Sequence, residues 1–170
     1  TSLLCTLLHY ENLMEIIDNF LTEKDFEVIE KVILSEDFAW YYNDSVSYEN
    51  DGKDFYFTHM VYNSVGVRSH LYEALTPFLN KLNIKTLDRI KVNLYPKTDV
   101  VAHHNSHVDT DYQHKGAILY MNSNDGLTVL KNKSINSIKN RVLLFDPSKP
   151  HNSTTCTDKK YRININVNYL

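Results

Sequence analysis

The chain has 170 residues, enough to bury the core of one domain, and it carries a formal net charge of -3. Hydrophobic residues make up 42% and charged residues 23%, as in ordinary globular proteins, and no apolar run approaches the roughly 20 residues of a membrane span. The 4 glycines are isolated, which excludes the Gly-rich loops of nucleotide-binding folds. The 2 cysteines exclude a disulfide-dense scaffold, and without a targeting signal we expect a cytoplasmic location.

Two helical patterns occupy the N-terminal half of the chain. Residues 22–35 start at Thr22, a favoured N-cap residue with an acidic residue three positions on, and continue with apolar residues at helical spacing. A second helix is predicted over 69–82, and Pro77 inside it should kink or split it. Between the two helices, Asp54–Tyr62 has the character of a strand.

Strands dominate the chain after residue 88. Turn signals separate six segments with strand character: Arg89–Tyr95, Val100–His104, Gly116–Met121, Leu127–Leu130, Arg141–Phe145 and Tyr161–Tyr169. Short strands separated by turns are typical of sandwiches and barrels. We therefore predict an α+β fold with a β-sandwich core, with helices on one outer face, and we treat 1–170 as a single domain.

The last of these segments, Tyr161–Tyr169, alternates strictly between polar and apolar residues. Because successive side chains of a strand point to opposite faces, one face is apolar and the other carries Arg162, Asn164, Asn166 and Asn168. Two interpretations remain open. The segment is an edge strand with its polar face in water, which this pattern alone favours, or its polar face lines a cavity for an anionic ligand.

A candidate metal site starts from the tripeptide His107-Val108-Asp109. On an extended segment, residues two apart face the same way, so the imidazole and the carboxylate can bind one ion. His151, after a predicted strand and turn, supplies a third ligand, and two His with one carboxylate are the ligand set of non-haem Fe(II) oxygenases. Arg162 follows His151 by 11 residues. Its guanidinium suits the far carboxylate of 2-oxoglutarate, since a buried Arg needs an anion.

With these residues in place, the sequence resembles the Fe(II)/2-oxoglutarate-dependent dioxygenases. The nearest likeness is the prolyl 4-hydroxylase-like branch, in the compact form common in phage and marine bacterial sequences, which adds a phage-infected host cell as a setting for the cytoplasmic location. The resemblance runs from about Met14 to Leu170, so residues 1–13 are an extra N-terminal extension. Its motifs are Ile16–Phe20, Phe38–Tyr42, Arg89–Pro96, His107–Asp109, Leu119–Asn122, Asn140–Phe145, His151 and Tyr161–Asn164.

The resemblance implies a double-stranded β-helix (a jelly roll) with N-terminal helices on one outer face and iron at its open mouth. The implied iron ligands are His107, Asp109 and His151. The implied 2-oxoglutarate contacts are Arg162 as the anchor, Tyr120 as a hydroxyl donor to the same carboxylate, Tyr95, and in a second tier Asn93 and Asn164. The implied cofactors are Fe(II) and 2-oxoglutarate, with ascorbate as a candidate reductant.

The reaction implied is hydroxylation of an aliphatic C–H, with a peptidyl proline as the lead substrate and with succinate and CO2 as co-products. The carboxylate of Asp109 disfavours the related halogenases, which lack that ligand. One alternative is an oxygenase acting on nucleic acid or a small molecule; the acidic balance argues against nucleic acid. Another is a metal-binding jelly roll without catalysis, which has no reason to keep Arg162. Oligomeric state stays open.

Three further histidines have no assigned chemistry. We expect His103 and His104 to be loop residues near the mouth of the site and His114 to be exposed to solvent. The segments Tyr41–Lys53 and Lys97–Ser106 are predicted to face the substrate, although neither contains a recognisable motif.

Overall fold

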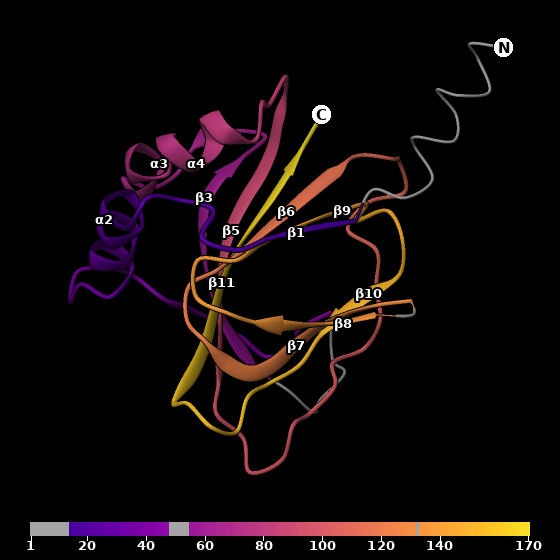
Figure 1. Cartoon of the computed structure of the whole chain (residues 1–170). Helices are drawn as coiled ribbons and strands as arrows, with labels where there is room; N and C mark the ends of the chain where they lie inside the picture. The colour runs from indigo at the N-terminus through magenta and orange to yellow at the C-terminus, as the bar shows by residue number, and fades with distance from the viewer. Residues whose placement is uncertain (1–13, 48–54, 132) are drawn as a thin grey trace, which may run out of the picture.

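The computed structural model describes residues 14–47, 55–131 and 133–170. Two antiparallel β-sheets face each other, and short helices cover the outer side of the larger sheet (Figure 1). This is the predicted arrangement of a jelly-roll core with helices on one face. The predicted N-terminal extension, 1–13, lies outside the described residues.

The larger sheet has 8 strands, in the order β1-β9-β6-β11-β5-β3-β2, and β4 pairs with β3. These strands are β1 Glu15–Ile17, β2 Tyr41–Asn43, β3 Tyr56–Asn63, β4 Gly66–Val67, β5 Leu87–Pro96, β6 Lys115–Tyr120, β9 Val142–Phe145 and β11 Tyr161–Tyr169. The last strand is paired on both sides, with β5 and with β6. The interpretation of Tyr161–Tyr169 as an edge strand with its polar face in water is therefore wrong, and its polar row faces the interior between the sheets.

The smaller sheet consists of three strands in the order β10-β7-β8: β10 His151–Ser153, β7 Asn124–Leu130 and β8 Lys133–Ser137. It lies against the inner face of the larger sheet. The hydroxyl of Tyr120 on β6 donates to Thr128 Oγ1 on β7 at 2.8 Å, and a small apolar cluster joins Ile118 and Phe145 to Ile135 of β8. Apolar side chains therefore fill part of the space between the two sheets, and polar side chains occupy another part.

The helices are α2 Glu23–Ile33, α3 Leu71–Ala74 and α4 Thr76–Lys81. Thr22 caps α2 as predicted, because its Oγ1 accepts a hydrogen bond from the Asp25 N–H at 3.2 Å, an interaction worth about 1 kcal/mol. Pro77 stands in the first turn of α4, so the predicted helix over 69–82 is split in two. All three helices bury apolar residues against the outward apolar row of β5 and β11, which forms the main core.

One predicted strand is absent. Val100–His104 runs as a loop that makes only an isolated bridge, His103 with Thr154. Its backbone uses side-chain partners instead, since the Ala102 N–H donates to Thr155 Oγ1 at 2.9 Å, and Val100 remains 73% exposed. Apolar residues in a row predict a strand only where a neighbouring strand can pair with them.

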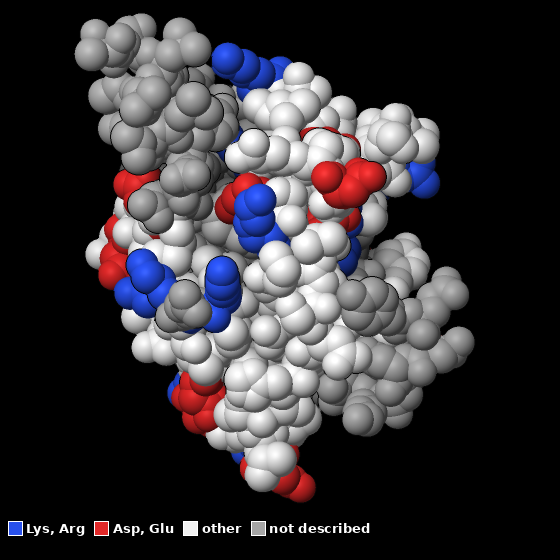
Figure 2. Space-filling view, turned by 90° about the vertical axis from the view of Figure 1, so that its right-hand side faces the viewer, with Lys and Arg blue, Asp and Glu red and all other residues white. Residues whose placement is uncertain are grey.

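No helix in the described part of the chain is long and apolar enough to cross a membrane. Charged side chains are scattered over the surface rather than segregated. On the face shown in Figure 2, Lys and Arg alternate with Asp and Glu among the residues described, without a continuous basic stripe. This distribution agrees with the net charge of -3.

Candidate metal centre

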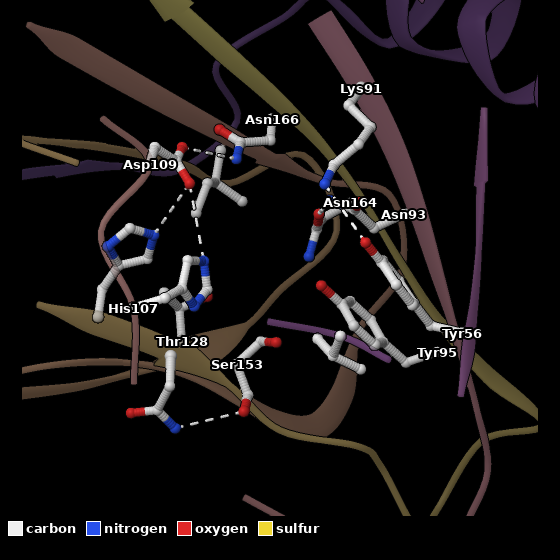
Figure 3. Close-up of a pocket in the computed structure, with 14 residues that line it drawn as sticks. Tyr56, Lys91, Asn93, Tyr95, His107, Asp109, Thr128, Ser153, Asn164 and Asn166 are labelled. Atoms are coloured by element: carbon white, nitrogen blue, oxygen red, sulfur yellow. Dashed lines mark hydrogen bonds and ion pairs between the residues drawn. The ribbon is translucent and has the colours of Figure 1, made fainter. Parts of the chain in front are cut away.

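The backbone positions His107, Asp109 and His151 before any side-chain contact is considered. His107 and His151 lie opposite each other in an isolated antiparallel bridge, and each N–H donates to the other's carbonyl at 2.9 Å. The Asp109 N–H donates to the Pro147 carbonyl, also at 2.9 Å. Segments about 40 residues apart in the sequence are thereby held together, and the three side chains project to one side, as Figure 3 shows for His107 and Asp109.

The donor atoms of these residues converge on one point. Asp109 Oδ1 lies 3.6 Å from His107 Nε2 and 3.8 Å from His151 Nε2, and all three donor atoms fall within 4.8 Å of one another. Ligand bonds of about 2.0–2.2 Å place the ligand atoms of one ion roughly 3–4 Å apart. The predicted triad therefore has the spacing that a single divalent ion requires.

Hydrogen bonds on the far side of each ring select the tautomer that ligates. His151 Nδ1 lies 2.9 Å from the Lys149 carbonyl and His107 Nδ1 lies 3.4 Å from the Asn105 carbonyl. A carbonyl can only accept, so Nδ1 carries a proton, and in the neutral form of each ring the lone pair is on Nε2, the atom that faces Asp109. Burial, reinforced by the neighbouring His151, also lowers the pKa of His107 and favours the neutral ring.

The two carboxylate oxygens of Asp109 have different partners. Oδ2 accepts hydrogen bonds from Asn168 Nδ2 at 2.8 Å and forms an ion pair with Arg89 at 3.0 Å, whereas Oδ1 faces the two imidazoles. Burial alone would raise the pKa of Asp109, but Arg89 and the hydrogen bond from Asn168 outweigh it and hold the pKa below its usual value. The group is a fixed anion with one free oxygen.

A cavity of about 50 Å³ opens beside the triad, and the lining includes three of the predicted contacts, Tyr95, Asn93 and Asn164. Asn93 Nδ2 donates to Asn164 Oδ1 at 2.9 Å across the β5–β11 pair. Figure 3 shows His107 and Asp109 on one side of this cavity and Tyr56, Tyr95 and Lys91 on the other. The described structure thus brings these three predicted contacts to the cavity that adjoins the triad.

Arg162 and Tyr120 lie behind this lining rather than in it. The Arg162 guanidinium is fully buried, stacks over the rings of Tyr95 and Tyr120, and donates to Thr128 Oγ1 at 3.0 Å and to Ser137 Oγ at 2.8 Å. No carboxylate among the described residues pairs with it. Burial raises the pKa of Tyr120, so its hydroxyl stays protonated and remains a donor.

Of the histidines without assigned chemistry, His114 differs from expectation and His104 lies in a loop as expected. His114 is buried, not exposed, with its Nδ1 2.9 Å from the Tyr112 carbonyl and 3.0 Å from Thr110 Oγ1. His104 is also buried, stacks on Tyr95 with ring centroids 5.1 Å apart, and has its Nδ1 2.7 Å from Ser153 Oγ.

Sequence reasoning missed Arg89, Lys91 and Thr128 as residues of the site, and it included Asn166 and Asn168 only as members of the polar row of Tyr161–Tyr169. The signal for Arg89 and Lys91 was present. Residues 89–95 alternate like the last strand, so Arg89 and Lys91 share a face with Asn93 and Tyr95, and the register pairs them with the polar row of β11.

No protein-family model matches the sequence, and no curated protein matches it. Solved structures do match over most of the chain. A prolyl hydroxylase from Trichoplax adhaerens, in complex with a hypoxia inducible factor oxygen degradation domain peptide fragment, has a TM-score of 0.66 at 15% identity and covers 94% of this chain and 84% of its own. The prolyl-4-hydroxylase of Pseudomonas putida has a TM-score of 0.65 at 10% identity, with 99% of each chain covered.

An oxidoreductase of the 2OG-Fe(II) oxygenase family from Burkholderia pseudomallei has a TM-score of 0.60 at 12% identity and covers 94% of this chain and 84% of its own. The chain has the fold of the 2OG-Fe(II) oxygenases. That fold is the one implied by the sequence resemblance, and the His-Asp-His cluster occurs in this setting.

Proposed function

We propose that this protein is an Fe(II)- and 2-oxoglutarate-dependent dioxygenase that hydroxylates an aliphatic C–H, with a peptidyl proline as the lead substrate. The convergence of three donor atoms, each on a side chain held by a hydrogen bond on its far side, carries the proposal. The fold shared with prolyl hydroxylases supports it.

In this proposal His107, Asp109 and His151 would hold the iron through two imidazole nitrogens and one carboxylate oxygen. Arg89 and Asn168 keep the Asp109 carboxylate ionised and oriented. When bound, iron with 2-oxoglutarate supplies the oxidation: O2 is consumed, the keto acid loses CO2 to give succinate, and one oxygen atom enters the substrate C–H as hydroxyl. The presence of a carboxylate ligand supports hydroxylation rather than halogenation.

Arg162 is proposed as the anchor for the far carboxylate of 2-oxoglutarate, assisted by the protonated hydroxyl of Tyr120 and by Thr128. A buried guanidinium without an anionic partner is costly, and a planar fork of donors matches a carboxylate. Tyr95, Asn93 and Asn164 line the path from this anchor to the triad. Their polar groups would orient the keto acid, and the aromatic walls would exclude water.

A peptide substrate is supported by the neighbour bound to a peptide fragment and by an open groove that leads to the triad. The described part of this groove is lined by Asn43, Asp44, Ser45, Val46 and Ser47 together with Tyr56, Arg89, Lys91 and the 107–109 segment. This places the predicted substrate-facing segment after Tyr41 next to the metal centre. The scattered surface charge gives no support to nucleic acid as the substrate.

The test is anaerobic addition of Fe(II) and 2-oxoglutarate to the purified chain, with the visible absorbance of the metal-to-keto-acid charge-transfer band as the readout. We expect a band in the wild type and none in the His107→Ala, Arg162→Ala double variant. A wild type without a band, or a double variant that keeps it, overturns the proposal. Succinate release, with ascorbate present as a reductant, is then screened against proline peptides, oligonucleotides and free amino acids.

A further inference from the structure

Lys91 occupies a position that the proposed reaction does not use. It lies on β5 opposite Asn166 of β11, and it lines both the inner cavity and the outer groove. In Figure 3 its amino group points into the space between Tyr56 and Asn164, on the side opposite His107 and Asp109. A molecule that reaches the metal from either direction passes this ammonium.

The charge of Lys91 is poorly compensated. Its Nζ donates to Tyr56 Oη at 3.4 Å and lies 5.7 Å from the centre of the same ring. No carboxylate among the described residues forms an ion pair with it, and Arg89, the neighbouring cation, already neutralises Asp109. Burial, with Arg89 nearby, lowers the pKa of Lys91 to about 8, the direction expected of an ammonium that lacks an anion.

Lys91 also stands at a defined distance from the second cation of the site. The register pairs Arg162 with Tyr95 and Asn166 with Lys91, so the backbone positions of the two residues are four residues apart along the strands, about 13 Å at 3.3 Å per residue. Lys91 faces the cavity across from His107 and Asp109, and Arg162 lies behind the cavity lining; neither cation pairs with a carboxylate among the described residues. An apolar side chain of similar length would fill the same place without the desolvation cost.

We propose that Lys91, with the Tyr56 hydroxyl, is a carboxylate-binding site beside the metal. This inference rests on the proposed oxygenase function. Two carboxylates have access to it: the metal-proximal carboxylate of 2-oxoglutarate from the inner cavity, and an acidic group of the substrate from the outer groove. The Lys91 ammonium and the Tyr56 hydroxyl can donate hydrogen bonds to either carboxylate.

The experiment compares wild type with Lys91→Met, Lys91→Gln and Lys91→Arg, using Lys160→Met at an exposed position as the matched control. The first arm measures 2-oxoglutarate binding to the anaerobic Fe(II) protein by calorimetry. The second arm compares the affinity for N-acetyl-L-proline with the affinity for N-acetyl-L-prolinamide in protein saturated with 2-oxoglutarate. The two compounds differ in one carboxylate. Thermal unfolding of the metal-free protein is recorded for every variant.

If the carboxylate belongs to 2-oxoglutarate, Lys91→Met and Lys91→Gln weaken its binding at least 10-fold, and Lys91→Arg restores most of the affinity. If it belongs to the substrate, 2-oxoglutarate binding is unchanged, the wild type prefers the acid over the amide at least 10-fold, and the neutral variants lose that preference. In both cases the unfolding temperature of Lys91→Met equals or exceeds that of wild type.

The proposal is overturned if the neutral variants change neither affinity. It is also overturned if Lys91→Gln and Lys91→Met lower the unfolding temperature and weaken the binding of both 2-oxoglutarate and the proline ligands. That result would show that Lys91 stabilises the fold. Failure of the oxygenase proposal is distinguishable, because it appears as absent 2-oxoglutarate binding in the wild type itself.

Discussion

The two ends of the cavity carry opposite charge requirements. At the metal end, one oxygen of the Asp109 carboxylate faces two imidazole rings and has no ion pair of its own, since Arg89 pairs with the other oxygen. At the anchor end, the Arg162 guanidinium is surrounded by hydroxyls and aromatic rings and lacks an anion. An iron ion and a dicarboxylate together satisfy both ends, whereas either alone leaves one end uncompensated. The difference explains why one cavity would bind two dissimilar ligands.

The two ends are also built differently. His107 and Asp109 come from a loop and His151 from a strand of three residues, held by a few backbone hydrogen bonds. Arg162 lies on β11, a strand of nine residues paired on both sides. Substitutions at the metal end should therefore alter ligand binding with little effect on folding, and substitutions at the anchor end should alter both. Four predictions test this contrast.

The largest effect is expected at Asp109. Asp109→Asn removes the anionic ligand, so the affinity for Fe(II) should fall by more than about 100-fold. The unfolding temperature should change little, because Arg89, whose side chain is 28% exposed, can be hydrated once it loses its partner. Equilibrium binding of Fe(II) or Mn(II) under anaerobic conditions provides the measurement. Asp111→Asn, an exposed neighbour, is the control. An Asp109→Asn variant that binds the metal as tightly as wild type would show that the cluster is not the metal site.

The next effect is expected at Arg162. Arg162→Met should weaken 2-oxoglutarate about 10- to 100-fold, since hydrogen bonds to charged groups contribute about 1.5–3 kcal/mol, while Fe(II) affinity stays constant. Arg162→Lys should give an intermediate value because it keeps the charge and loses the fork. Titration of the charge-transfer band measures both constants, with Arg68→Met as the exposed control. Equal losses of metal and keto acid would contradict two separate ends.

A smaller effect is expected at Asn168, which touches Asp109 and no ligand. Asn168→Ala removes the 2.8 Å hydrogen bond to Asp109 Oδ2 and should reduce Fe(II) affinity about 10-fold. Asn166→Ala removes a longer contact of 3.5 Å to the same oxygen and should cost less. If the two variants lose the same affinity, the oxygen is positioned by Arg89 rather than by the asparagines.

The features of this site that depend on neighbouring residues could be predicted from the sequence, whereas those that depend on contacts between distant segments could not. The period of two in His107-Val108-Asp109 and in Tyr161–Tyr169 depends on neighbouring residues, and both patterns correctly grouped side chains that share a face. The pairing of His107 with His151 is a contact between distant segments, so no local period predicts it; only the place of His151 after a predicted strand and turn, and the resemblance to known oxygenases, indicated it. Whether β11 is an edge or a central strand depends on β6, and the alternation alone pointed to the wrong answer.

The same reasoning accounts for part of the high asparagine content of the chain. Asparagine occurs 18 times, and two of these residues were expected near the cavity. The structure adds Asn166 and Asn168, whose amides hold Asp109. These two residues were predictable only as members of a polar row, because the identity of their partner depends on a loop some 57 residues away in the sequence. One of the 4 glycines, Gly126, is likewise required by contacts with a distant segment.

Gly126 gives the last prediction, and it concerns the anchor end alone. A Cβ at this position would lie 2.6 Å from Arg162 Cδ and 2.8 Å from the Thr155 carbonyl, so Gly126→Ala must displace the arginine. We expect a loss of about 1–3 kcal/mol in the free energy of unfolding and a several-fold weaker affinity for 2-oxoglutarate. Gly116→Ala is the matched control, because it crowds Phe145 and Pro147 instead. It should lose comparable stability in chemical denaturation and keep its keto-acid affinity. If both variants weaken 2-oxoglutarate equally, the effect is general to the fold and the position of Arg162 does not set the affinity.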